Sequence, residues 1–313
     1  MHRHAHGHHR HAPAHAGEGP GERPLVLATA VNLLLTVVQI VAGVLAGSLA
    51  LVADAVHNLS DALALAVALA ARRIARWPAH PGMTFGYGRA EPVAALVNLT
   101  TLVAIGLYLL WEALVRLFVP EPVAGAWVMA VAGVALVIDT ATALLVARLA
   151  RESVNVRAAF LHNIADALGS VAVVVAGFAV WAFGWLWVDP LVTLLIAGYI
   201  LAHGLLEMVP VVRLLMGATP LGLDPEEVAA AIRRVPGVLD VHHLHLWQIT
   251  ERELSLEAHV VVPDTTSAAE IETVKHRVKA MLAERFDIGH STLEMELACE
   301  ASFCPDSHLV VPH

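Results

Sequence analysis

Long apolar runs fill about the first two thirds of the chain, and amphipathic patterns replace them after about residue 218. A helix needs about 20 apolar residues to cross a hydrocarbon core of roughly 30 Å. Six runs are long enough, and we expect transmembrane helices at residues 25–46, 49–71, 92–118, 125–147, 158–183 and 188–215. The pattern therefore predicts a polytopic α-helical membrane domain.

The periodicity beyond residue 224 alternates between helical and strand-like. We expect a helix at 225–235, strands at 238–250 and 254–262, a helix at 268–286 and a strand at 291–297. The order αββαβ predicts a small α+β domain of the ferredoxin-like type. The expected domains are a histidine-rich tail at 1–23, a membrane domain at 24–218, a soluble metal-binding domain at 219–298 and a Cys- and His-containing tail at 299–313.

The composition agrees with a membrane protein, because 58% of the residues are hydrophobic and only 15% are charged. The net charge of −9 argues against a nucleic-acid partner. Basic residues gather on one side of the predicted membrane, at Arg72, Arg73, Arg76, Arg148, Arg151 and Arg157. The loops on the other side carry no Lys or Arg. The positive-inside rule thus predicts that both termini and the soluble domain are cytosolic.

A short polar pattern occurs twice inside the apolar runs, as His57-x3-Asp61 and His162-x3-Asp166, with 162 − 57 = 105 residues between the copies. Residues four apart share one helix face, so each copy presents an imidazole beside a carboxylate. Ionisable groups in hydrocarbon mark functional sites by default, and two His with two carboxylates suit Zn²⁺. The alternative is structural, with each His donating a hydrogen bond to the other helix's Asp. Asp54 and Asp139 are further buried acids, either proton relays or interhelical hydrogen-bond partners.

Candidate metal ligands also occur outside the membrane. Seven of the 19 histidines lie before residue 16, and this segment can gather metal loosely or be a solvated tail. A reducing cytosol disfavours a disulfide between Cys299 and Cys304, so thiolate ligation is expected instead. In the soluble domain, strict alternation predicts that His243 and His245 share a face opposite to His242. The expected cytosolic ligands are His242, His259, His290, Glu296, Cys299 and Cys304.

Several segments together resemble the cation diffusion facilitator family of proton-coupled metal exporters. These are residues 48–61 (SLALVADAVHNLSD), 85–91 (FGYGRAE), the second His-x3-Asp pattern, Asp189-Pro190 and residues 241–247 (VHHLHLW). The resemblance implies six transmembrane helices, a cytosolic ferredoxin-like domain and a homodimer. His57, Asp61, His162 and Asp166 match the family's transport site, and His242, His259, His290 and Glu296 its cytosolic metal positions.

Imidazoles in both membrane patterns resemble the family's zinc-preferring branch. The expected function is thus Zn²⁺/proton antiport by alternating access in a bacterial inner membrane, with lipid as the surrounding partner and no organic cofactor. A broader Zn/Cd/Co exporter and a membrane-bound zinc sensor without net transport are the alternatives. An intramembrane zinc hydrolase is a third, but the chain contains no His-Glu-x-x-His helix and offers no suitable general base.

Overall fold

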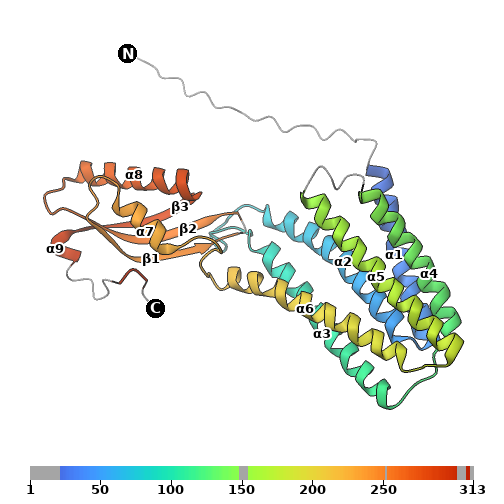
Figure 1. The fold of residues 1–313 in the computed structure, drawn as a ribbon. Coiled ribbons are helices and arrows are strands. Elements are labelled where there is room, and N and C mark those ends of the chain that lie inside the picture. The colour runs from blue at the N-terminus through green and yellow to red at the C-terminus, as the bar shows by residue number, and fades with distance from the viewer. Residues whose placement is uncertain (1–21, 148–153, 251, 302–307, 311–313) are drawn as a thin grey trace. The chain divides into compact units, whose positions relative to one another are not determined.

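The computed structural model describes residues 22–147, 154–250, 252–301 and 308–310. Six long helices come first, and their bounds are α1 (Glu22–Ala46), α2 (Leu49–Ala75), α3 (Ala90–Phe118), α4 (Gly125–Ala147), α5 (Val154–Phe183) and α6 (Val188–Leu215). Each bound lies within a few residues of the predicted apolar run. The predicted membrane domain of six long helices is therefore confirmed (Figure 1).

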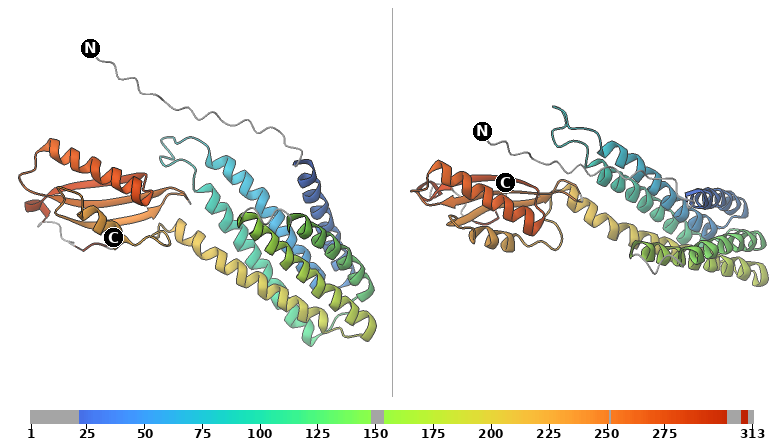
Figure 2. Two further views of the ribbon diagram at one scale, coloured as in Figure 1. Left: turned by 45° about the horizontal axis from the view of Figure 1, so that its top comes forward. Right: turned by 90° about the horizontal axis from the view of Figure 1, so that it is seen from above.

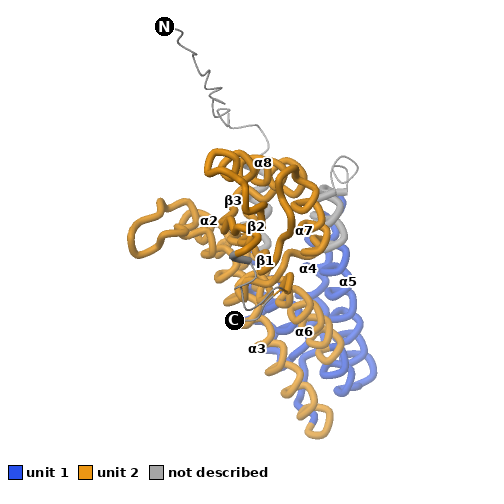
Figure 3. Tube along the Cα trace, turned by 90° about the vertical axis from the view of Figure 1, so that its left-hand side faces the viewer, with its two compact units in different colours: residues 1–59, 120–192 blue, residues 60–119, 193–313 orange. Residues whose placement is uncertain are grey.

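Length and apolar composition suffice for membrane crossing in four stretches of the described residues, which are Leu49–Ala75, Ala90–Phe118, Ile164–Phe183 and Val188–Leu215. Two shorter apolar stretches, Leu33–Ala46 and Gly125–Ala141, belong to α1 and α4. The chain forms two compact units (Figure 3). Unit 1 contains the described residues up to Leu59 with Pro120–Val192, and unit 2 contains Ser60–Val119 with the described residues from Thr193 onward.

Helices α4 and α5 of unit 1 run side by side in both views of Figure 2. They approach closely at Gly125 and Gly177, since a Cβ added at Gly125 would lie 2.5 Å from the Gly177 carbonyl oxygen. Small residues at such crossings let two membrane helices pack backbone to backbone. This packing fixes the position of α5, which carries Asp166.

The start of α2 is held by the carboxylate of Asp189, from the first turn of α6. Its oxygens accept hydrogen bonds from the Ser48 hydroxyl and, at 2.9 Å, from the Leu49 backbone N–H. Ser48 in turn caps the helix, because its Oγ accepts from the Leu51 N–H at 3.1 Å. A carboxylate at a helix N-terminus pairs with unsatisfied N–H donors and the positive end of the helix dipole. The register of α2, and with it the position of His57, is set by this cap.

The soluble domain lies within unit 2 and has the predicted order. Its elements are α7 (Pro225–Arg233), β1 (Asp240–Gln248), β2 (Leu254–Val262), α8 (Ala268–Phe286), β3 (His290–Leu297) and the short α9 (Ala298–Ala301). The sheet order is β1-β2-β3, with β1 antiparallel and β3 parallel to β2. Apart from α9, which sequence periodicity did not predict, the arrangement confirms the αββαβ domain.

Alternation along β2 separates the two faces of the sheet. Leu256, Ala258 and Val260 are fully buried in a core that also contains Val278 of α8 and Ile232 of α7. Ser267 caps α8 with a capping box, in which its Oγ accepts from the Glu270 N–H at 3.4 Å and the Glu270 carboxylate accepts from the Ser267 N–H at 2.8 Å. The helices thus cover one sheet face, and the polar residues between the buried positions of β2 lie on the other.

A β-bulge interrupts β1. His242 pairs with His259 and His245 with Glu257, so two residues of β1 oppose one of β2. The extra residue is His243, whose φ of 50° lies in the left-handed region. Residues 308–310 run along this edge, where His308 and Leu309 carbonyls accept hydrogen bonds from the His243 and Leu244 N–H groups at 3.0 and 2.6 Å. The bulge and the segment beside it therefore shape the strand that carries His242.

Candidate metal centres

The first group of candidate ligands lies in the apolar helices. His57 of α2 is buried, and its Nε2 is 3.4 Å from Oδ1 of Asp166 on α5. Asp61 follows His57 by one turn of α2. One possible ligand atom from each of the three residues lies within 4.8 Å of the other two. Imidazole nitrogen and carboxylate oxygen in this spacing can hold a divalent cation. His162 lies outside the residues whose side chains the structure describes.

The buried acids next to this group are joined by hydrogen bonds. Gln39 of α1 donates from Nε2 to Asp54 at 3.0 Å. The Ser170 hydroxyl of α5 lies 3.3 Å from Asp54 and 3.0 Å from Asp139 of α4. All four residues are buried. The interhelical partners of Asp54 and Asp139 are thus Gln39 and Ser170, and Ser170 is a residue that sequence analysis did not single out.

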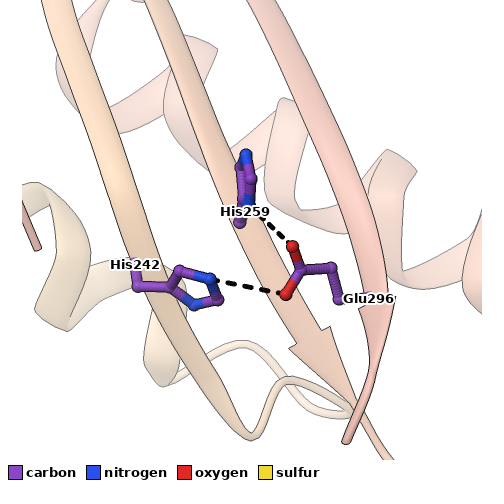
Figure 4. A group of neighbouring side chains, drawn as sticks. All are labelled: His242, His259 and Glu296. Atoms are coloured by element: carbon purple, nitrogen blue, oxygen red, sulfur yellow. Dashed lines mark ion pairs between the residues drawn. The ribbon is translucent and has the colours of Figure 1, made fainter. Parts of the chain in front are cut away.

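The second group of candidate ligands lies on the sheet face opposite α7 and α8. Figure 4 shows His242, His259 and Glu296 projecting from three neighbouring strands. The Glu296 carboxylate lies 2.6 Å from Nδ1 of His259 and 3.4 Å from Nε2 of His242. Within the described residues these two nitrogens and one Glu296 oxygen are buried and have no hydrogen-bond partner. Buried polar atoms need partners, and a metal ion bound by the three side chains would supply one.

The prediction from strict alternation is right that His243 and His245 share a face, since their ring centroids are 5.1 Å apart, and wrong that His242 lies on the opposite face. The bulge at His243 places His242 and His245 on one face, opposite Leu244 and Leu246 of the core. The His243 ring stacks on that of His259, with centroids 4.7 Å apart. Alternation presumes one residue per pleat, and the extra residue shifts everything after it by one.

Glu294 is a neighbour of this group that sequence analysis missed. Its carboxylate lies 3.4 Å from Nε2 of His259, the imidazole nitrogen that does not face Glu296. The spacing of Glu294 and Glu296 on β3 was the available signal, because residues two apart in a strand share a face.

Of the other predicted cytosolic ligands, His290 and Cys299 are not brought to this group. His290 begins β3, six residues before Glu296, which corresponds to roughly 20 Å along a strand. Its ring packs edge-on against Phe85, with centroids 6.4 Å apart. Cys299 is exposed in α9, where its N–H donates to Asp264 at 2.7 Å. Cys304 and the histidines of the N-terminal tail lie outside the described residues.

Comparison with known protein families accounts for both parts of the chain. The model described as the cation efflux transmembrane domain matches residues 25–216, and the model of the cation efflux protein cytoplasmic domain matches residues 220–298. The chain belongs to the cation diffusion facilitator family. As a family member it is a multi-pass membrane protein that exports metal cations, and it is not an enzyme. The family's cytoplasmic domain is associated with dimer formation.

Individual relatives of this cation efflux protein are similar over most of their length. The metal cation efflux system protein CzcD of Cupriavidus metallidurans is 38% identical, with 89% of this chain and 88% of the relative covered. The zinc transporter ZitB of Escherichia coli is 35% identical, with 92% and 90% covered. The "cadmium, cobalt and zinc/H(+)-K(+) antiporter" of Bacillus subtilis is 35% identical, with 83% and 84% covered.

The comparison with solved structures matches a domain of a relative. It is the metal-bound C-terminal domain of the CzcD transporter from Cupriavidus metallidurans, which is 44% identical. The match covers 24% of this chain and 100% of that chain, with a TM-score of 0.22.

Proposed function

We propose that this cation efflux protein exports Zn²⁺ from the cytosol in exchange for protons, with His57, Asp61, His162 and Asp166 as the transport site. The observation that supports the proposal best is the 3.4 Å approach of His57 to Asp166, because these residues come from the two copies of the repeated pattern. A purely structural His–Asp contact would not require Asp61 beside it. In this proposal residues 24–218 form the transport domain of a homodimer in a bacterial inner membrane, with both termini cytosolic.

Proton coupling follows from competition for the same ligand atoms. A carboxylate or an imidazole must be deprotonated to bind a metal ion, so binding releases protons and protonation favours release of the metal. An imidazole with an ordinary pKa near 6.5 changes charge in the range where such an exchange operates. Metal would enter from the cytosol and leave on the other side as outside protons replace it. The antiporter named in Bacillus subtilis supports this direction of coupling.

Imidazole ligands support Zn²⁺ as the preferred substrate, as does the name of the ZitB relative. The Bacillus subtilis antiporter is also named for cadmium and cobalt, which favours the broader selectivity as the second candidate.

We further propose that His242, His259 and Glu296 hold a regulatory metal ion. A metal there would bind three strands together and draw the two cytoplasmic domains of a dimer into a fixed arrangement. Cys299 and Cys304 stay candidate ligands for metal in the cytosolic domain, and the N-terminal histidines are candidates for gathering metal.

The test is metal uptake into proteoliposomes under an imposed pH gradient. Wild type should take up Zn²⁺ with a rate that follows the gradient, and Asp166→Ala should lose the uptake. Glu112→Gln is the matched control, because it removes a carboxylate that pairs with Arg116 on α3 at 3.1 Å, away from the repeated pattern. Flux that ignores the gradient would refute proton coupling. Metal binding without flux in membrane-inserted dimers would favour the sensor alternative. Uptake of Cd²⁺ and Co²⁺ at the same rate as Zn²⁺ would favour the broader exporter.

A further inference from the structure

A charged cavity, separate from both metal groups, lies in unit 2, where the end of α2 meets the cytoplasmic domain. Its volume is about 560 Å³. Arg72 of α2 and Arg76, one residue beyond the end of α2, line one side of it. Trp77 and Tyr87 of the loop before α3 line a second, and Arg252 of the β1–β2 turn lines a third. The description of residues 220–298 as a cytoplasmic domain places the cavity on the cytoplasmic side.

The loop before α3 is packed against the domain, so these walls form one structure. Arg89 donates from Nε to the Ile249 carbonyl oxygen at 3.4 Å. A Cβ at Gly88 would collide with the Thr250 side chain. Trp77 packs edge-on against Tyr87, with centroids 5.4 Å apart. The cavity is thus a built pocket and not a gap between separate parts.

The pocket offers guanidinium groups to an anion. Among the described residues, no ion pair involves Arg72, Arg76 or Arg252. Glu91 and Glu253 also line the cavity, which leaves one net positive charge. Guanidinium groups bind phosphate through two parallel N–H donors, and aromatic residues such as Trp77 favour the headgroup level of a membrane. These groups together suit a phosphate at the membrane surface.

The surface of α2 below the pocket indicates where the phosphate comes from. Leu65, Leu69 and Arg72 are spaced by four and three residues, so they form one stripe on α2. Arg76 follows Arg72 by four residues, just beyond the end of the helix. Leu65 and Leu69 are 57% and 61% exposed. An apolar track that leads along a membrane helix to paired arginines matches an acyl chain attached to a charged headgroup.

We propose that this pocket binds the phosphate of an anionic phospholipid from the cytoplasmic leaflet, with an acyl chain along Leu65 and Leu69. Basic pockets at the cytoplasmic ends of membrane helices are suited to lipid headgroups. The bound headgroup joins α2 to the β1–β2 turn. The proposal does not depend on the identity of the transported metal or on proton coupling.

Native mass spectrometry of the full chain, purified from mixed phosphatidylglycerol and phosphatidylcholine, tests the proposal. Wild type should retain phosphatidylglycerol in preference to phosphatidylcholine. The double variant Arg72→Gln, Arg76→Gln should retain it about tenfold less or weaker still, because it loses charge-assisted hydrogen bonds. Arg73→Gln is the matched control, since Arg73 is on the same turn but does not line the cavity. Equal loss in the control, or unchanged retention in the double variant, overturns the proposal.

Two further arms complete the test. Arg252→Gln should also retain less phosphatidylglycerol than wild type. Because Arg252 lies outside the membrane helices, this variant tests the proposal even if the double variant fails to insert into the membrane. Inorganic phosphate and glycerol 3-phosphate, added in excess, should leave the retained phosphatidylglycerol in place. Complete displacement of phosphatidylglycerol by these soluble anions would overturn the proposal of a lipid ligand and would indicate that the pocket binds free phosphate.

Discussion

The two candidate metal groups both combine imidazoles with carboxylates, but on different frameworks. The membrane group takes His57 and Asp61 from one turn of a helix and Asp166 from a second helix. The cytoplasmic group takes one ligand from each of three strands. Helical spacing fixes two ligands locally, whereas the sheet group exists only once strand pairing and a bulge are in place.

This difference bears on what each group can do. A pair of ligands on one helix can move together when that helix shifts, which suits a site that must bind and release its ion. Ligands spread over three hydrogen-bonded strands are held by the ladder and by a core that includes Val260 and Val278. Binding there stabilises one arrangement of the domain, which suits a regulatory ion. The predictions below test this contrast.

The largest expected effect separates the two groups by function. Asp61→Asn should reduce Zn²⁺ flux by about 100-fold or more, because loss of a ligand should cost at least as much as the 10–100-fold typical of outer-shell changes. Glu296→Gln should weaken metal binding by the cytoplasmic domain by a similar factor, so that the domain loses its bound metal. Maximal flux should stay within about threefold of wild type, because Glu296 does not belong to the membrane group. Flux assays and metal counting per chain measure both. Loss of flux in Glu296→Gln would make the cytoplasmic group part of transport.

A smaller effect concerns ion choice at the membrane group. His57→Asp replaces the borderline-soft imidazole nitrogen with a hard oxygen ligand, which should relax the preference for Zn²⁺. We expect the ratio of Cd²⁺ to Zn²⁺ flux to rise several-fold. His242→Asp in the cytoplasmic group is the control and should leave this ratio unchanged. An unchanged ratio in His57→Asp would mean that selectivity resides elsewhere.

The bulge offers a test of how far the cytoplasmic group depends on backbone shape. His243→Val places a β-branched residue at a φ of 50°, which should cost roughly 1–2 kcal/mol and weaken metal binding at this group about tenfold. His243→Gly also lacks the ring but accepts the conformation, so binding should be affected less. Isothermal calorimetry on the full chain compares them. Equal affinities would show that the bulge is not needed for the group.

The smallest expected effect lies on the helix that covers the sheet. Hydrogen bonds from the Ser267 side chain and backbone lower the pKa of Glu270 below its usual 4.5. A lowered pKa adds stability above pH 4.5 that is lost as the pH falls through the folded value. Ser267→Ala should therefore speed amide exchange at the start of α8 several-fold at pH 7, and the difference from wild type should shrink as the pH falls below 4.5. A pH-independent difference would exclude the charge of the Glu270 carboxylate as its origin.

Sequence pattern predicted the helices well because about 20 apolar residues in a row have few alternatives to a membrane helix. It also found the His57–Asp61 pair, since that spacing is local. It also held the signal that separates His290 from Glu296, because six residues along one strand span roughly 20 Å whatever the register. The bulge at His243 was missed, as nothing in a run of histidines marks which residue takes a positive φ. Ser170 was not predicted, because an uncharged serine in an apolar run does not indicate a buried hydrogen-bond network.

The contact of residues 308–310 with β1 has a consequence for solubility. An edge strand with unpaired N–H groups is a template for adding a strand from another molecule. Here the carbonyls of His308 and Leu309 already accept from the His243 and Leu244 donors. The segment therefore blocks edge-to-edge aggregation of cytoplasmic domains. A truncation that removes residues 308–310 would expose the edge of β1, so recombinant forms of the protein should keep this segment.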